Sequence, residues 1–231
     1  MEGRIAGSAQ AEQGALEIIR AGTSLGRVPL VPEVRLHLAT EPIGLWQQLE
    51  LAAGRTGMDP PFWGFAWAGG QALARYVLDH PETVAGRQVI DVASGCGLAA
   101  IAAAMAGAAA VTAYDIDPLA AAAVTLNSAA NAVTVHAACD DILDQGSLPA
   151  PGTGVVLIAD AFYQRELAAR MIRFAQRSQA RGAAVLVGDF GRAYLPRDRL
   201  RPLATYDVPG LGELESSDVK RTTVWGLAGP G

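Results

Sequence analysis

The pattern of apolar positions is most regular after residue 86, where short continuous apolar runs alternate with longer alanine-rich stretches. Apolar runs without polar alternation are typical of strands in a parallel sheet that is covered on both faces. Alternation of such strands with helices implies right-handed crossover connections. The predicted strands are 88–92, 110–115, 133–137, 154–159 and 183–188, and the predicted helices are 97–106, 118–130 and 164–180. The pattern therefore predicts a doubly wound α/β sheet.

The two ends of the chain follow a different pattern. Residues 9–21 and 42–53 have the periodicity of helices, and residues 31–38 between them fit either a strand or a helix. Near the C-terminus, 203–208 and 219–227 are predicted strands with no helix between them, which is typical of an antiparallel hairpin. We expect a Rossmann-like sheet of about seven strands, mostly parallel with an antiparallel C-terminal hairpin, plus an N-terminal helical extension.

A proline-opened, tryptophan-rich segment at 59–70 separates these regions. The segment passes through Gly69-Gly70 into a predicted helix, which we expect Pro81 to end. No internal repeat or low-complexity linker precedes it. We therefore expect an N-terminal extension or cap over residues 1–58 and one main domain over residues 59–231.

Charge and cysteine content disfavour several classes of function. The chain has 18 Lys and Arg against 23 Asp and Glu, so nucleic acid is a disfavoured partner. Cys96 and Cys139 lie far apart without metal-ligand spacing, so we expect no disulfide framework, no metal site and a reducing cytoplasm. The apolar runs are too short to span a bilayer. Abundant alanine and a single lysine, Lys220, are typical of a GC-rich bacterial genome.

The turn after the first strand of the regular region, D-V-A-S-G-C-G at 91–97, has the character of a ligand-binding turn. Gly95 and Gly97 let the backbone approach a ligand, and the helix that follows presents free N–H groups. Ala100 stands where the third small residue of a dinucleotide motif would fall, so spacing alone allows a dinucleotide. Asp91 disfavours it, because a carboxylate repels a pyrophosphate and attracts a cationic, amino-acid-like group.

Acidic residues end the next two strands as well. Asp115 ends the second strand of this region, where a carboxylate can accept both hydroxyls of a ribose, and Asp141 follows the third, where it can bind an adenine amino group. Ligands of open α/β sheets bind beyond the carboxyl ends of the strands, so these acids are expected to converge. The expected ligand is a nucleoside that carries an amino-acid tail and no phosphate, which describes S-adenosyl-L-methionine. Asp117, before Pro118, is better explained as a helix N-cap.

Three motifs, D-V-A-S-G-C-G, Y-D-I-D-P and A-D-A-F-Y, resemble the seven-β-strand class I methyltransferases. More narrowly, the chain resembles the lysine methyltransferases of the electron-transfer flavoprotein β subunit. The resemblance covers about residues 28–227 and includes F-W-G-F-A-W-A-G-G, G-D-F-G-R and T-T-V-W-G. One position departs from the family, because Ala93 stands where glycine is usual. Its methyl group is tolerated if φ is negative, and it narrows the space around the methionine tail.

The resemblance implies roles for individual residues. The implied cofactor pocket is made by Trp67, Asp91, Ser94, Gly95, Gly97, Asp115, Ile116, Asp141, Ile142 and Ala159. The catalytic residues implied by D-A-F-Y are Asp160 and Tyr163, which are placed where the target amine meets the methyl group. Phe162 and Asp189 are expected to bind the substrate, although turn capping explains Asp189 equally well. Trp63 fits a pocket wall or the core equally.

The function implied by the resemblance is S-adenosyl-L-methionine-dependent methylation of a protein lysine, with S-adenosyl-L-homocysteine as product. The expected partner is the electron-transfer flavoprotein β subunit or, for some members, a ribosomal stalk protein. One alternative is a nucleic-acid or small-molecule amino methyltransferase, although D-A-F-Y lacks the two prolines typical of base aminomethylases. A second alternative is a non-catalytic cofactor-binding module, which would not need Asp160 and Tyr163.

Overall fold

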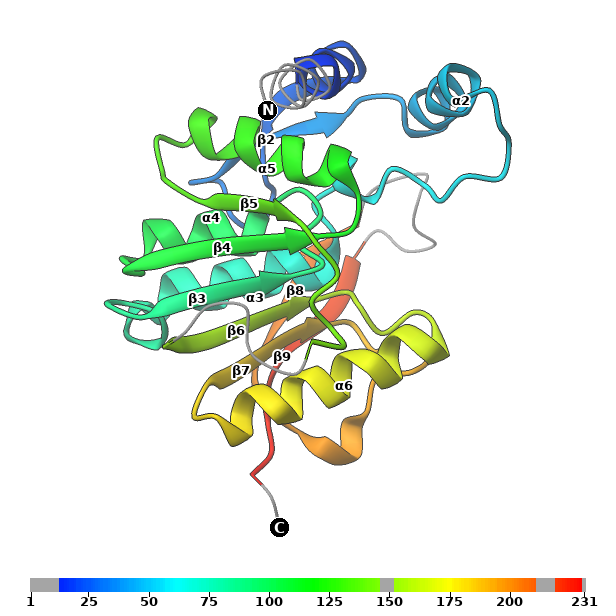
Figure 1. Ribbon diagram of the computed structural model, residues 1–231. Coiled ribbons are helices and arrows are strands. Elements are labelled where there is room, and N and C mark those ends of the chain that lie inside the picture. The colour runs from blue at the N-terminus through cyan, green and yellow to red at the C-terminus, as the bar shows by residue number, and fades with distance from the viewer. Residues whose placement is uncertain (1–12, 146–151, 211–218, 230–231) are drawn as a thin grey trace, which may run out of the picture.

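The computed structural model describes residues 13–145, 152–210 and 219–229, and its centre is a seven-stranded sheet of order β5-β4-β3-β6-β7-β9-β8 (Figure 1). Strands β3 to β7 are mutually parallel, whereas β9 is antiparallel to both β7 and β8. The strands are β3 (Gln88–Val92), β4 (Ala110–Asp115), β5 (His136–Cys139), β6 (Thr153–Ala159), β7 (Ala184–Asp189), β8 (Leu200–Pro209) and β9 (Val219–Leu227). The predicted doubly wound sheet with an antiparallel C-terminal hairpin is confirmed.

Helices cover both faces of this sheet. Helices α3 and α4 pack on one face and α6 on the other, as Figure 1 shows. Successive residues of one strand therefore enter different cores: Val155 packs with the first layer and Val156 with the second. Burial of both faces explains the unbroken apolar runs. The helices are α2 (Pro42–Ala53), α3 (Ala68–Asp79), α4 (Leu98–Met105), α5 (Pro118–Ala130) and α6 (Arg165–Ala180).

The N-terminal region is less helical than the sequence predicts. Residues 13–22 and α2 are helical, but between them β1 (Thr23–Arg27) and β2 (Arg35–Ala39) form a separate antiparallel hairpin. The sequence does not predict β1, because T-S-L-G-R lacks an apolar pattern and this strand is held by pairing with β2. The hairpin is joined to α5 by side-chain amides: Asn127 accepts the backbone N–H of His37 at 2.7 Å, and Asn131 that of Arg35 at 2.9 Å.

Two further boundaries differ from the prediction. The strand expected at 133–137 begins only at His136, because Val133 and Val135 pack against the core from the preceding loop. Burial, rather than strand pairing, causes the apolar pattern there. Strand β8 also begins three residues earlier than its apolar run, because β9 pairs with it from Leu200 onwards.

Two glycines let the beginning of α3 approach the end of β7. A Cβ atom on Gly69 would overlap the carbonyl oxygen of Gly188 and the Asp160 carboxylate. The close approach lets the backbone N–H of Gly70 donate to Asp160 Oδ2 at 3.0 Å. Gly69 and Gly188 are therefore the glycines that let this helix approach β7 and Asp160.

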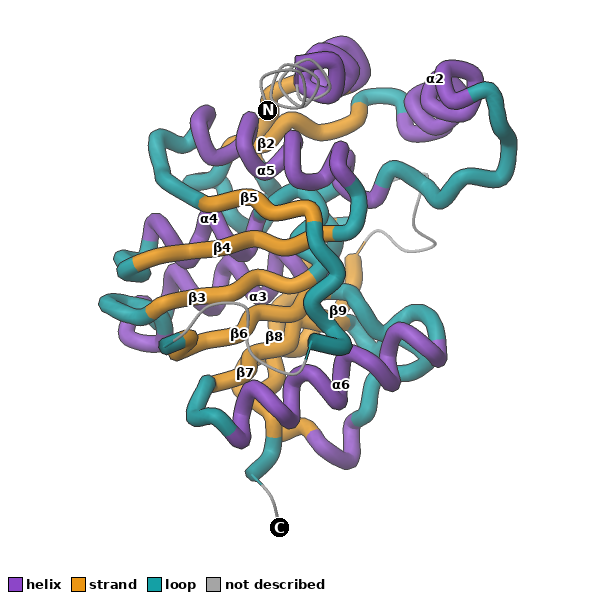
Figure 2. The backbone as a smooth tube through the Cα atoms, viewed as in Figure 1, coloured by secondary structure: helices purple, strands orange, loops and turns teal. Residues whose placement is uncertain are grey.

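The loops that leave β3, β4, β5 and β6 all emerge at one edge of the sheet, as the tube in Figure 2 shows. This edge is where open α/β sheets bind ligands. None of the helices in the described ranges is long and apolar enough to cross a membrane.

Candidate functional site

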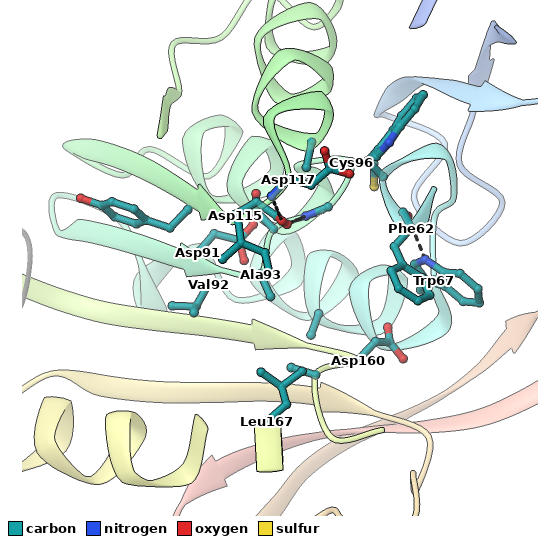
Figure 3. A pocket seen from close by; sticks show the side chains of 18 of the residues that line it. Phe62, Trp67, Asp91, Val92, Ala93, Cys96, Asp115, Asp117, Asp160 and Leu167 are labelled. Carbon is teal, nitrogen blue, oxygen red and sulfur yellow. Dashed lines mark hydrogen bonds between the residues drawn. The ribbon is translucent and has the colours of Figure 1, made fainter. Parts of the chain in front are cut away.

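A cavity of about 540 Å³ lies at the carboxyl ends of β3, β4 and β6. Its wall includes the turn after β3, the acids that end β4 and follow β6, and the aromatic segment between Phe62 and Trp67 (Figure 3). The predicted convergence of strand-end carboxylates is therefore present, since Asp91, Asp115, Asp141 and Asp160 all line this one cavity.

The glycine turn is held by its own backbone and by β4. The Ser94 N–H donates to the Tyr114 carbonyl at 3.1 Å, and Gly95 N–H donates to Asp115 Oδ2 at 2.9 Å. Gly97 has a φ of 80°, and a Cβ there would lie 2.9 Å from Val124 Cγ2, so both conformation and space require glycine. The Ser94 Oγ is buried, and no described side chain or backbone group pairs with it. Such an orphaned hydroxyl is suited to a polar ligand group.

Ala93 lies in the same turn with a φ of 55°. The negative φ that would accommodate its methyl group is therefore not adopted. A left-handed conformation costs an L-residue about 1 to 2 kcal/mol relative to its ordinary range. The turn keeps this shape because the hydrogen bonds of Ser94 and Gly95 fix it on either side, and the methyl group is exposed at the cavity wall.

Asp91 is almost fully buried, with 1% of its surface exposed. Its Oδ2 accepts the backbone N–H of Ala100 at 3.1 Å, from the first turn of α4. Burial raises the pKa of this carboxyl to about 7, and the charge of Asp115 adds to the increase, while the Ala100 hydrogen bond opposes it. A cationic ligand would lower the pKa of Asp91 again, because an opposite charge favours the ionised carboxylate.

Asp115 is held by backbone N–H groups on both oxygens: Oδ2 accepts from Gly95, and Oδ1 accepts from Asp117 at 3.0 Å. Burial raises its pKa, and these hydrogen bonds partly oppose the shift. A carboxylate oxygen can accept more than one hydrogen bond, so both oxygens remain able to bind vicinal hydroxyls. Asp117 caps α5 as expected, with its Oδ1 accepting the Leu119 N–H at 2.8 Å.

Asp141 carries an ion pair that the sequence did not reveal. Arg170 Nη2 donates to its two carboxylate oxygens at 2.9 and 2.8 Å, and this partner holds the Asp141 pKa below its ordinary value. Any contact with an adenine amino group would share the carboxylate with this arginine. Two apolar residues also line the cavity: Ile142 is buried, whereas Ile116 is 72% exposed and open to a planar ligand.

Aromatic rings form the opposite wall. The Trp67 Nε1 donates to the Phe62 carbonyl at 2.9 Å, and the Phe62 ring centroid lies 6.0 Å from that of Trp67 and 5.7 Å from that of Tyr163. Trp63 is fully buried yet lines the cavity, so it serves as core and wall at once. Its Nε1 has no partner among the described residues.

Asp160 follows β6 and points towards this aromatic wall (Figure 3). Only 8% of it is exposed, and its backbone has a φ of 54°, in the left-handed region. Its Oδ1 accepts from Arg192 Nη2 at 3.1 Å and Nε at 3.2 Å, and its Oδ2 accepts from Gly70. Burial raises the pKa of Asp160 to about 6, against the opposing charge of Arg192.

Comparisons with known proteins decide the family. The family model of ribosomal protein L11 methyltransferase (PrmA) matches residues 71–160. The electron transfer flavoprotein beta subunit lysine methyltransferase of Xenopus laevis is 36% identical over 206 residues, covering 85% of this chain and 80% of that protein. The Homo sapiens protein of the same name is 35% identical over 205 residues, covering 86% and 76%. The chain belongs to this lysine methyltransferase family.

Solved structures support the fold of the family. Magnesium protoporphyrin IX methyltransferase from Synechocystis with bound S-adenosylmethionine has a TM-score of 0.50 at 15% identity and covers 79% of this chain and 90% of that one. Trm5b from Pyrococcus abyssi has a TM-score of 0.52 at 15% identity and covers 90% and 56%. At this identity the likeness concerns the fold alone. The named lysine methyltransferase relatives, rather than these structures, confirm the predicted family, enzyme class and cofactor at the level of the family.

Two residues expected to bind the substrate lie elsewhere. Phe162 is fully buried in the core beneath α6 and does not line the cavity, so its position does not support a substrate contact. Asp189 is fully buried, and its Oδ1 accepts the backbone N–H groups of Gly191 at 2.6 Å and Arg192 at 2.7 Å. The turn-capping interpretation of Asp189 therefore describes its contacts. Ala159 and Tyr163 line the cavity beside Asp160.

The sequence pattern does not predict the two arginines that bind Asp141 and Asp160. Arg170 lies on α6, 29 positions beyond Asp141, and Arg192 lies 32 positions beyond Asp160. A signal existed only for Arg192, because it closes the G-D-F-G-R motif. No motif marks Arg170.

Proposed function

We propose that this chain transfers a methyl group from S-adenosyl-L-methionine to a lysine side chain of the electron transfer flavoprotein β subunit. The observation that carries the proposal is its similarity, over 85% of the chain, to lysine methyltransferases named for that substrate. The chemistry of the cavity agrees, because carboxylates stand at one end and a buried carboxylate with aromatic rings at the other.

The residues at the glycine-turn end fit the cofactor. We assign the ammonium of its amino-acid tail to Asp91, a polar group of that tail to the orphaned Ser94 Oγ, and the ribose hydroxyls to Asp115. We assign the flat adenine ring to Ile116 and Ile142 and its amino group to Asp141. Trp67 and Ala159 line the part of the cofactor pocket beyond the turn. The carboxylates at this end would repel a pyrophosphate, which disfavours a dinucleotide.

When bound, this cofactor supplies an activated methyl group on a sulfonium, so the protein mainly has to align the amine and exclude water. The lysine must attack as the neutral amine, and neutralising it at pH 7 costs about 4 to 5 kcal/mol from its reference pKa. Asp160 accepts a hydrogen bond from the amine and orients its lone pair. Tyr163 and Trp67 close the site and offer cation–π contact to a methylated ammonium, worth about 0.5 to 2 kcal/mol.

We also propose that residues 1–58, of which 1–12 lie outside the described residues, form a cap on the main domain. Arg55 and Met58 line the cavity from this region, and α2 stands apart from the sheet on that side (Figure 1). We propose that the protein works in the cytoplasm, because Cys96 and Cys139 are free thiols. A ribosomal protein substrate has less support, because the Geobacillus thermodenitrificans ribosomal protein L11 methyltransferase matches only 32% of this chain.

The direct test incubates the purified chain with labelled cofactor and, separately, with electron transfer flavoprotein, ribosomal protein L11 and total RNA from its own organism. We expect label in the flavoprotein β subunit, located on lysine by mass spectrometry. Asp160→Asn is the matched control and should give no label. Label only in L11 or only in RNA would replace the proposed substrate with that one.

A further inference from the structure

Arg192 occupies a position that the proposed reaction must take into account. Its guanidinium donates two hydrogen bonds to Asp160 Oδ1, and its side chain is only 19% exposed. The carbon at the centre of the guanidinium lies 4.8 Å from the ring centroid of Phe190, 5.8 Å from that of Tyr163 and 5.9 Å from that of Trp67. A permanent cation thus lies at the end of the cavity where the target amine would react.

The turn that carries Arg192 is fixed from below. The buried Asp189 accepts the backbone N–H groups of both Gly191 and Arg192 on one oxygen. Gly191 has a φ of 101°, which only glycine adopts readily, so the sequence itself favours the conformation of this turn. The Tyr194 N–H then donates to the Phe162 carbonyl at 3.2 Å and joins the segment to the one that follows β6. Hydrogen bonds therefore fix both the backbone of Arg192, through Asp189, and its guanidinium, through Asp160.

Asp160 needs such a partner, because its surroundings disfavour a charge. Burial raises the pKa of this carboxyl, and the neighbouring charge of Asp189 raises it further, whereas Arg192 and the Gly70 N–H lower it. The other titratable groups near it are the buried Cys96 thiol and the Tyr163 hydroxyl, and burial raises the pKa of both. Arg192 is therefore the one cation among the described groups that act on the ionisation of Asp160.

We propose that Arg192 is a positioning residue for methyl transfer, whose fixed guanidinium keeps the Asp160 carboxylate ionised and oriented towards the lysine amine. The inference rests on the function proposed above. A carboxylate alone would stabilise the unreactive ammonium form of lysine. The Asp160–Arg192 pair as a whole has almost no net charge, so the carboxylate can accept a hydrogen bond from the amine without holding the amine in its protonated form.

The opposite interpretation gives Arg192 an inhibitory role. Its guanidinium, set among three aromatic rings, could simply occupy the place of the substrate cation. The two interpretations differ in sign, because removing an obstruction raises turnover, whereas removing the partner of Asp160 lowers it.

The experiment compares wild type with Arg192→Gln, Arg192→Lys and, as a control, Arg199→Gln, whose side chain is 51% exposed nearby in the sequence. An opposite charge at hydrogen-bond distance lowers a carboxyl pKa by about 1 to 3 units. A loss of about 2 units would leave about a tenth of Asp160 ionised at pH 7, so we expect turnover of Arg192→Gln to fall about tenfold. The deficit should shrink as the pH rises towards about 9, since the carboxyl ionises again. Arg192→Lys should restore part of the rate, and Arg199→Gln should match wild type.

A second measurement does not depend on methyl transfer. Titration of ¹³C-labelled aspartate carboxyls by NMR, with Asp160→Asn to assign the signal, should show the Asp160 midpoint moving upwards by about 1 unit or more in Arg192→Gln. An unchanged midpoint, or faster turnover in Arg192→Gln, would overturn the inference. A shifted midpoint in a protein that methylates no lysine would instead retain the Asp160–Arg192 coupling and reject the proposed function. Thermal unfolding of each variant shows that the fold is kept, and Arg192→Lys serves if the Gln variant does not fold.

Discussion

The two ends of the cavity use carboxylates in different ways. At the glycine-turn end, Asp91 and Asp115 accept hydrogen bonds from backbone N–H groups, with no arginine or lysine among their described partners. At the β6–β7 end, Asp160 is paired with Arg192. Among the described residues, the first end has no cation beside these two carboxylates, which suits a ligand that brings its own cation and hydroxyls. At the second end the Asp160–Arg192 pair has almost no net charge before any ligand arrives, which suits an amine that must lose its proton.

The two ends also differ in how local they are in the sequence. Residues 91–117, within one strand, turn, helix and strand, supply Asp91, Ser94 and Asp115 of the glycine-turn end. The β6–β7 end brings together Gly70, Asp160 and Arg192 from three distant segments. The PrmA family model stops at residue 160 and thus covers the first end but not Arg192. The more similar lysine methyltransferases extend further over the chain.

The largest expected effect is on turnover, from one substitution at the β6–β7 end that leaves the glycine-turn end unchanged. Asp160→Asn keeps the shape of the side chain but removes its charge, and loss of a positioned acid–base group typically costs about 100- to 10,000-fold in rate. We expect turnover to fall by at least about 100-fold, while cofactor affinity by isothermal titration stays close to wild type. Turnover like wild type would remove Asp160 from the mechanism, and lost affinity would show that the ends are coupled.

Asp91→Asn tests the energetic cost of the glycine-turn end. The folded pKa of Asp91 is about 7, against 3.8 for the exposed group, so ionising this buried carboxyl opposes folding. The folded state therefore binds the extra proton, and wild-type stability falls as the pH rises from about 4 to about 7. Asn cannot ionise, so the variant should be more stable by up to about 4 kcal/mol above pH 7 and about equal below pH 4.

Urea unfolding at several pH values measures this difference. The same variant should bind the cofactor more weakly, since the ammonium loses its counter-charge. A stability difference that does not change with pH would show that ionisation of Asp91 does not destabilise the folded protein.

Asp115→Ala tests cofactor affinity at the glycine-turn end. A hydrogen bond to a charged group contributes about 1.5 to 3 kcal/mol, so losing the ribose acceptor should weaken binding by about 10- to 100-fold. Asp140→Ala is the matched control, because this exposed carboxylate lines the same cavity. Isothermal titration of both variants decides the matter: equal losses would mean that general negative charge attracts the cofactor, and no loss at Asp115 would misplace the ribose.

Sequence patterns predict this molecule well where the cause is local. Strands β3, β4 and β6 were predicted because most of their residues face one apolar layer or the other, and Asp91 and Asp115 because they lie at the ends of such strands. Strand β1 was missed because its partner, rather than its composition, makes it a strand. Arg170 and Arg192 were missed for a related reason. An ion pair between residues about 30 positions apart depends on how distant segments meet, which no local pattern records.

Ala93→Gly, within the glycine turn, has the smallest expected effect on stability. The φ of 55° at Ala93 is the conformation that a position where glycine is usual favours, and alanine adopts it only at a cost. Replacing it with glycine removes about 1 to 2 kcal/mol of strain but adds about 0.4 to 1 kcal/mol of unfolded-state entropy. The net gain should be about 0.5 to 1 kcal/mol, or a few degrees in Tm.

Ala132→Gly supplies the matched control, since Ala132 has the same φ of 55° and does not line the cavity. Both variants should unfold at slightly higher temperature in the absence of ligand. Only Ala93→Gly should also change cofactor affinity, because only there does the lost methyl group widen the space beside the glycine turn. Equal affinity changes in the two variants would mean that the turn responds to general stability, and a lower Tm for Ala93→Gly would mean that the methyl group contributes packing that outweighs its backbone strain.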